Sequence, residues 1–203
     1  MVKKKVPTTE KGRATRERII QAATDLVTEN GVAGMNLDDI RARTGASRSQ
    51  IYHYFEDRKD IVHAVINATT KMVLINQGEL LHGLDTWAGI DSWFQALVHN
   101  EVSRGGCGGC PIGTLVGQLA EKDQDARAAI AEGFDQWEAH LRDGLTRMKI
   151  EGKLNKDADP ATLATATMAS IQGGLLLTQV RRDPCQLRIA LDAARNNLYL
   201  AKS

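Results

Sequence analysis

One short polar run, Ser47-Arg48-Ser49-Gln50, carries the side chains best suited to a chemical task in this 203-residue chain. Arginine can bind the N7 and O6 atoms of guanine, and glutamine can bind the N6 and N7 atoms of adenine, when they stand at the start of a helix in the major groove of DNA. Gln50 has an alternative task, because Ser-x-x-Gln is also the pattern of a helix capping box. We therefore expect base contacts from this run, foremost from Arg48, and leave the task of Gln50 open.

A second candidate for chemistry is the pair Cys107-x-x-Cys110 in a glycine-rich stretch. A thioredoxin-like redox pair needs a βαβ context and a zinc site needs two further ligands at matching spacing, and the sequence offers neither. We therefore expect no metal and no cofactor. Cys110 stands just before Pro111, which favours the first position of a helix, so the helix dipole would stabilise its thiolate and raise its reactivity. Packing of a small side chain in a tight turn is the alternative.

The elements that must position the polar run are marked by their end signals. Asn36 can cap a helix over residues 37–44, with Asp39 three residues later, and Gly45 stands where such a helix needs a left-handed residue. A second helix should begin at Arg48, so the two helices form a helix-turn-helix. The expected shared core, with a preceding helix, consists of Ile20, Leu26, Leu37, Ile40, Ile51 and Phe55.

Apolar residues recur at helical spacing through the rest of the chain, without strand alternation, so the expected fold is all-α with about nine helices. A helix-turn-helix domain would cover residues 1–57, with residues 1–12 as a basic, flexible arm, and a larger helical domain would cover residues 58–203. The expected helices cover residues 13–30, 37–44, 48–55, 58–77, 86–102, 111–119, 123–150, 160–180 and 185–199.

Composition and charge narrow the class of protein. No apolar run approaches the length of about 18 residues that a membrane span needs, and the N-terminus lacks the apolar segment of a secretion signal. Three cysteines argue against a disulfide framework and fit a reducing cytoplasm. Residues 1–63 carry 12 Lys and Arg against nine Asp and Glu, and the remainder carries 14 against 16. This asymmetry points the N-terminal part toward a polyanion.

Residues 13–65 resemble the DNA-binding domain of the TetR family of repressors. The resemblance rests on Asn-Gly-Val after the first helix, Thr-Gly-Ala-Ser at the turn, and Ile-Tyr-His-Tyr-Phe over residues 51–55 followed by Lys59. Asn36 stands where the family usually has Thr, and Tyr54 stands where it often has His. Both substitutes can still form hydrogen bonds, so the resemblance implies binding to double-stranded operator DNA.

The same resemblance implies which residues contact phosphates. Tyr52, Tyr54 and Lys59, with the backbone beside Asn36, would fix the register on DNA without reading its sequence. Packing of Tyr52 on the first helix is the alternative, and His53 is expected to face solvent.

The resemblance also implies a homodimer and an effector site in the C-terminal part. Residues 161–180, rich in Ala, Gly and Leu, and residues 185–199 would pack against their symmetry copies. A central core helix is the alternative for residues 161–180. A small hydrophobic effector would bind among the middle helices. The candidate contacts, each of which can instead be plain core, are Met72, Trp87, Trp93, Cys110, Phe134, Trp137 and Met168.

Residues 109–121, with Gln172-Gly173-Gly174-Leu175, resemble a TetR subgroup that has a Gly-Cys step before its sixth helix. Some members of that subgroup sense electrophiles or oxidants through a cysteine at this step. A thiol sensor that uses Cys110 is therefore the alternative to a non-covalent effector site.

The expected function is a cytoplasmic, sequence-specific regulator that acts as a two-state switch and not as an enzyme. Effector binding would move the helix over residues 59–77, change the spacing of the two recognition helices, and release the operator. Activation in place of repression stays open. An enzyme that used Cys110 would lack a paired base, and a protein that coats DNA would spread its basic residues over the whole chain.

Overall fold

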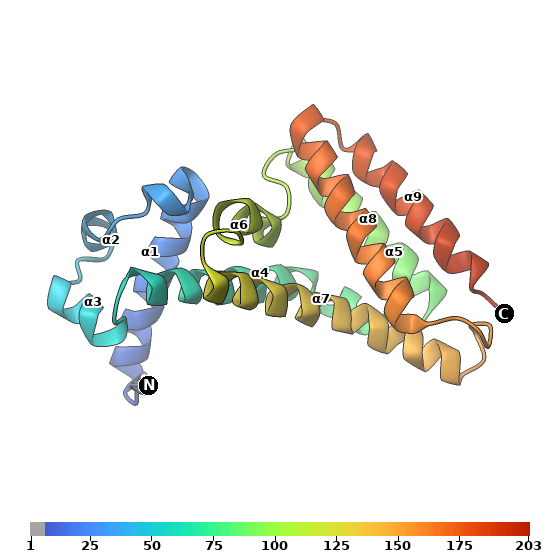
Figure 1. Cartoon of the computed structure of the whole chain (residues 1–203), viewed down its shortest axis with the longest axis horizontal. Coiled ribbons are helices and arrows are strands. Elements are labelled where there is room, and N and C mark those ends of the chain that lie inside the picture. Colours follow the sequence, from blue (N-terminus) through green and yellow to red (C-terminus); the bar gives the residue numbers. More distant parts are fainter. Residues whose placement is uncertain (1–6) are drawn as a thin grey trace. The chain divides into compact units, whose positions relative to one another are not determined.

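The computed structural model describes residues 7–203, which contain nine α-helices and no strand (Figure 1). The predicted all-α class is therefore confirmed. The helices are α1 (Glu10–Gly34), α2 (Leu37–Thr44), α3 (Arg48–Tyr54), α4 (Arg58–His82), α5 (Trp87–Ser103), α6 (Pro111–Leu119), α7 (Gln124–Ile150), α8 (Pro160–Arg181) and α9 (Cys185–Leu200). None of these helices is both long enough and apolar enough to cross a membrane.

The chain forms two compact units that differ from a simple division into N-terminal and C-terminal halves. One unit consists of the chain up to Met72 together with Leu115–Gly133, and the other consists of Val73–Thr114 with Phe134–Ser203. Helices α4, α6 and α7 each contribute residues to both units. Compactness and function need not divide a chain at the same residue, so the functional boundary expected at residue 57 stays a prediction.

Helix α1 begins earlier than the sequence pattern predicted. The hydroxyl of Thr9 accepts a hydrogen bond from the N–H of Gly12 at 3.1 Å, so this cap starts the helix at Glu10 instead of residue 13. The expected flexible arm over residues 1–12 is therefore wrong for residues 10–12, while residues 1–6 lie outside the described part. Gly31, at φ 70° and ψ 171°, interrupts α1 where its end was predicted.

The core of the first unit contains four of the six residues predicted for it. Leu26, Ile40, Ile51 and Phe55 are buried, whereas Ile20 and Leu37 are only partly covered. Ile19 is fully buried in place of Ile20. Neighbouring residues on a helix point about 100° apart, so an error of one position in the apolar pattern selects the wrong side chain.

In the second unit, α8 and α9 run side by side and antiparallel (Figure 1). An aspartate followed by a proline stands at the start of each of these two helices. Asp159 accepts hydrogen bonds from the N–H groups of Ala161 and Thr162, both at 3.2 Å, and Pro160 occupies the first helical position. Asp183 likewise accepts from the N–H of Cys185 at 3.0 Å at the start of α9.

Candidate functional site

The helix-turn-helix is built by the caps that the sequence predicted. The side-chain oxygen of Asn36 accepts from the N–H of Asp39 at 2.9 Å, and its amide donates to the Asp39 carboxylate at 2.7 Å. Gly45 adopts the left-handed conformation at φ 67°, and its N–H donates to the carbonyl of Arg41 at 2.8 Å. The Asn36 bonds start α2 and the Gly45 bond ends it, after which α3 begins within three residues.

The capping box at the start of α3 is complete. The N–H of Gln50 donates to the Ser47 hydroxyl at 3.2 Å, and the N–H of Ser47 donates to the Gln50 side-chain carbonyl at 2.8 Å. Ser49 lies beside them, with its hydroxyl 3.0 Å from that of Ser47. Gln50 therefore caps α3 in this structure, which leaves its side-chain NH₂ group as the part that can donate to a base.

Arg48 projects from the first turn of α3 into solvent. Its side chain is 62% exposed and lies 3.7 Å from the carboxylate of Asp38, which makes a shorter ion pair of 2.9 Å with Arg41. An exposed ion pair at such a distance contributes little, so Arg48 can leave Asp38 for a base edge at small cost.

The three residues predicted to contact phosphates lie in different environments. Tyr52 is 50% exposed, which is compatible both with a phosphate contact and with half-buried packing on the first helix, so its role stays a prediction. Tyr54 is partly covered, and the His53 ring meets it edge-on with ring centres 5.0 Å apart. Phe55 is buried as predicted, with the Arg16 guanidinium 5.3 Å above its ring.

Lys59 already has an anionic neighbour. Its ammonium lies 3.3 Å from the carboxylate of Asp123, which also accepts from the N–H groups of Asp125 and Ala126. The hydrogen bond from the Ala126 N–H, and to a smaller extent the one from Lys59, lowers the pKa of Asp123 below its ordinary value. A DNA phosphate at Lys59 would therefore compete with a carboxylate that stays ionised.

Two polar side chains that the sequence analysis missed hold the end of α1. The carbonyl of Gln118, on α6, accepts from the N–H of Val32 at 2.6 Å. Arg58, at the start of α4, donates to the carbonyl of Val32 and to that of Met35, the latter at 3.3 Å. Both residues belong to the same compact unit as α1. No local pattern marks either side chain, because their partners lie 23 or more positions away.

The structure brings two of the seven predicted effector contacts onto one acceptor. The indole N–H groups of Trp93 and Trp137 both donate to the side-chain carbonyl of Gln77, at 2.6 and 3.0 Å. Trp93, Cys110, Trp137 and Met168 are buried, Trp87 and Phe134 are partly covered, and Met72 is exposed. Trp87 stacks on Tyr199 with ring centres 4.8 Å apart. Gln77 was not predicted, and effector contact by any of the seven stays a prediction.

Cys110 departs from the sequence prediction. Its sulfur accepts from the N–H of Gly113 at 3.3 Å, as expected just before a helix, but the side chain is buried. Burial raises the pKa of Cys110, and the N–H groups of Gly113 and Ile112 offset this only in part. The expected gain in thiolate is therefore wrong, because desolvation of the charged form outweighs the helix N-terminus.

A buried carboxyl group also belongs to this part of the second unit. Burial raises the pKa of Glu101, although the Arg104 guanidinium lies 3.1 Å from one carboxyl oxygen and lowers it. The other oxygen is buried and without a hydrogen bond in the described structure. All three cysteines are free thiols, and within residues 7–203 no His, Cys, Asp and Glu side chains gather into a group that could hold a metal ion.

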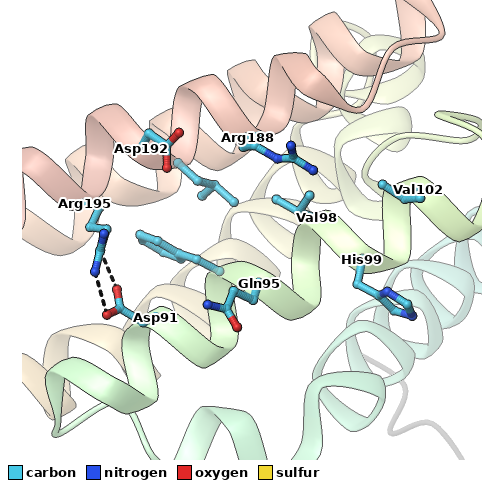
Figure 2. A pocket seen from close by; sticks show the side chains of 10 residues that line it. Asp91, Gln95, Val98, His99, Val102, Arg188, Asp192 and Arg195 are labelled. Atoms are coloured by element: carbon cyan, nitrogen blue, oxygen red, sulfur yellow. Dashed lines mark hydrogen bonds and ion pairs between the residues drawn. The ribbon is translucent and has the colours of Figure 1, made fainter.

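A groove of about 520 Å³ lies between α5 and α9 (Figure 2). One end is closed by Arg195, whose guanidinium binds both carboxylate oxygens of Asp91 at 2.7 and 2.9 Å. None of the seven predicted effector contacts lines this groove. Its lining residues are Asp91, Phe94, Gln95, Val98, His99, Val102, Arg188, Leu191, Asp192 and Arg195.

Comparison with known proteins agrees with this geometry. The family model for bacterial regulatory proteins of the tetR family matches residues 19–65. The model for the C-terminal domain of LmrA/YxaF-like transcriptional regulators matches residues 87–193. An uncharacterized HTH-type transcriptional regulator of Lactococcus lactis is 31% identical over 84% of this chain and 86% of its own length.

Solved structures share the fold. A TetR transcriptional regulator from Chloroflexus aurantiacus superposes with a TM-score of 0.77 at 22% identity, covering 94% of this chain and 97% of that one. The reduced form of Escherichia coli NemR superposes with a TM-score of 0.74 at 21% identity, covering 90% of this chain and 96% of that one.

Proposed function

The chain belongs to the TetR family of DNA-binding transcriptional regulators, and from this premise we propose that it is a homodimeric repressor released from a pseudo-palindromic operator by a small hydrophobic effector. The observation that carries the proposal is the capped, exposed start of α3. Its polar side chains face solvent while the apolar side of the same helix is buried at Ile51. We place its action in the cytoplasm, where operator DNA is found.

The contacts proposed with DNA fall into two groups. Arg48 and the NH₂ group of Gln50 read base edges from the first turn of α3, flanked by Ser47 and Ser49. Tyr52, Tyr54, Lys59 and the backbone beside Asn36 bind phosphates and fix the register. The proposal is supported by the exposure of Arg48, Tyr52 and Lys59, and by the rigid caps that hold both helices.

The proposed dimer forms through α8 and α9. Leu176 and Val180 on α8 are 60% and 72% exposed, and Ile189 on α9 is 60% exposed. A side chain at Gly173 would find open space, so a second backbone can approach there. Apolar side chains gathered on neighbouring helices are typical of a surface that another protein covers. A two-fold dimer would present two α3 helices to half-sites about one helical turn, or a multiple of it, apart.

The proposed effector binds near the buried cluster of Gln77, Trp93 and Trp137. Gln77 belongs to α4, the helix whose other end carries Lys59 and Arg58. An effector that displaced one indole N–H from Gln77 would therefore act on the helix that continues to the DNA-binding residues. A coupling free energy of about 1–3 kcal/mol would lower operator affinity roughly 5- to 150-fold.

Thiol sensing at Cys110 is the second candidate function. It is favoured by the position of the sulfur at the start of α6, where it accepts the N–H of Gly113. Burial of the thiol works against it, so modification would require α6 to open first. Operator release by diamide that persists in a Cys110→Ser protein would rule this candidate out.

Fluorescence anisotropy at fixed salt on the DNA upstream of the protein's own gene tests the main proposal, with an unrelated fragment of equal length as control. We expect a preference of about a thousandfold or more. Arg48→Ala should lower specific affinity by about 1–3 kcal/mol, whereas Lys156→Ala, an exposed charge of the other unit, should leave it unchanged. Equal, salt-sensitive binding to both fragments by the unmodified protein would instead indicate a DNA-coating protein.

A further inference from the structure

The groove between α5 and α9 contains none of the residues proposed above for DNA or effector contacts, and we propose that it binds an amphipathic organic anion. Such a ligand has an apolar body and a single carboxylate or sulfonate group. The volume of about 520 Å³ falls within the range of small-molecule sites. This proposal goes beyond the proposed function and depends on neither the operator nor the effector.

The floor and walls of the groove suit the apolar body. Phe94 and Leu191 are buried at its base, while Val98 and Val102 line the side of α5 and remain partly exposed or exposed. These α5 residues recur every four positions, so they form one continuous apolar stripe along the helix. A ligand that covered the stripe would remove the exposed side chain of Val102 from water, which is favourable for apolar surface.

The charged groups of the groove determine which ligand charge fits. Asp91 and Arg195 neutralise each other in a bidentate pair, to which the Tyr199 hydroxyl adds a hydrogen bond of 3.3 Å. By contrast, no hydrogen bond or ion pair engages the side chain of Arg188 or of Asp192 within residues 7–203. The groove therefore offers one unpaired cation and one unpaired anion, one turn apart on α9.

The orientation of these two side chains favours an anionic ligand. Figure 2 shows Arg188 reaching over the groove toward Val98, whereas the carboxylate of Asp192 stays close to α9. A guanidinium can donate two parallel hydrogen bonds to a carboxylate or sulfonate, and it does so most strongly beside apolar surface. The anionic group would thus sit at Arg188 with its apolar body along Phe94, Val98 and Leu191.

The proposed dimer leaves the groove open. The residues of α9 that line it are Arg188, Leu191, Asp192 and Arg195, whereas Ile189 marks the exposed apolar side. At about 100° per residue around the helix axis, Ile189 lies about 60° from Asp192 and about 100–160° from Arg188, Leu191 and Arg195. Ligand binding and dimerisation can therefore occur together.

Two fluorescent probes with related ring systems test the proposal on the full-length protein. The first, 8-anilinonaphthalene-1-sulfonate, carries the anionic group, and the second, N-phenyl-1-naphthylamine, has the same rings without it. We expect Arg188→Gln to lower the affinity for the sulfonate probe about tenfold and to change the affinity for the neutral probe by less than about twofold. Asp192→Asn should raise the affinity for the sulfonate probe about twofold, because it removes a negative charge near the anionic group. Arg142→Gln, a half-exposed arginine on α7, serves as the matched control and should change neither probe.

Val98→Trp fills the groove and should weaken both probes, with circular dichroism verifying that the variant stays helical. An unchanged affinity of the sulfonate probe in Arg188→Gln would overturn the proposal whatever Val98→Trp does. Equal weakening of both probes by Arg188→Gln would show an apolar groove without an anion subsite, which also overturns it.

Discussion

The contact between Gln118 and the end of α1 gives a prediction whose size follows from the geometry. Gln118→Met keeps the length of the side chain but removes the oxygen that accepts the Val32 N–H at 2.6 Å. This donor is partly buried, and a donor left unsatisfied costs about 1–3 kcal/mol when buried. Because water can reach it in part, we expect a loss of about 1 kcal/mol in the free energy of unfolding.

Gly31 provides a second perturbation of the same contact. At φ 70° and ψ 171° it occupies a backbone region that costs a residue other than glycine about 1–3 kcal/mol to adopt. A Cβ at Gly31 would also lie 2.9 Å from the side-chain oxygen of Gln118, so that Gly31→Ala must push this oxygen away. The double variant should therefore lose less free energy than the sum of the two single variants.

Urea unfolding at one protein concentration and hydrogen exchange of the Val32 amide measure these effects. Gln118→Glu retains an acceptor oxygen, so it should protect the Val32 amide better than Gln118→Met does. If Gln118→Met leaves both the exchange rate and the free energy of unfolding unchanged, the Gln118 contact does not stabilise the end of α1. Strict additivity of Gly31→Ala and Gln118→Met would show that the two changes do not break one shared hydrogen bond.

Three further predictions concern other parts of the chain. Ser47→Ala removes one half of the capping box and should cost about 1 kcal/mol in urea unfolding, while Ser47→Thr should not. The raised pKa of Glu101 means that its contribution to stability is present at low pH and declines as pH rises through that pKa. The free energy of unfolding of Glu101→Gln should therefore rise relative to that of the unmodified protein between pH 4.5 and pH 8. An unchanged difference between the two across that range would contradict this. Leu176→Asp should shift the mass measured by light scattering from dimer to monomer, while Lys156→Asp, at an exposed position in the loop before α8, should not.

The helix-turn-helix could be predicted because its signals are local. Each cap joins residues three or four positions apart, as Asn36 with Asp39 and Ser47 with Gln50 show. Their partners are therefore determined by the order of the residues alone, and the bounds of α2 and α3 were predicted to within one residue. The same holds for the starts of α6, α8 and α9, where a proline is the first helical residue or directly precedes it.

Which side chains are buried was harder to predict, because burial depends on residues far apart in the chain. Cys110 has the local position of an activated thiol, yet its pKa depends on how many apolar atoms surround it. The exchange of Ile19 for Ile20 in the core has the same origin, because the face of α1 that becomes buried depends on the helices that pack against it.

The sequence by itself determined the fold class, the nine helices of residues 7–203 and the polar start of α3, since these depend on helical periodicity and on caps between near neighbours. Only the tertiary structure decided that Gln77 joins Trp93 to Trp137, that Gln118 holds Val32, and that α5 and α9 leave a groove between them. These features join residues from 16 to about a hundred positions apart in the chain. Their geometry is set by how whole helices pack, and no spacing within one helix encodes it.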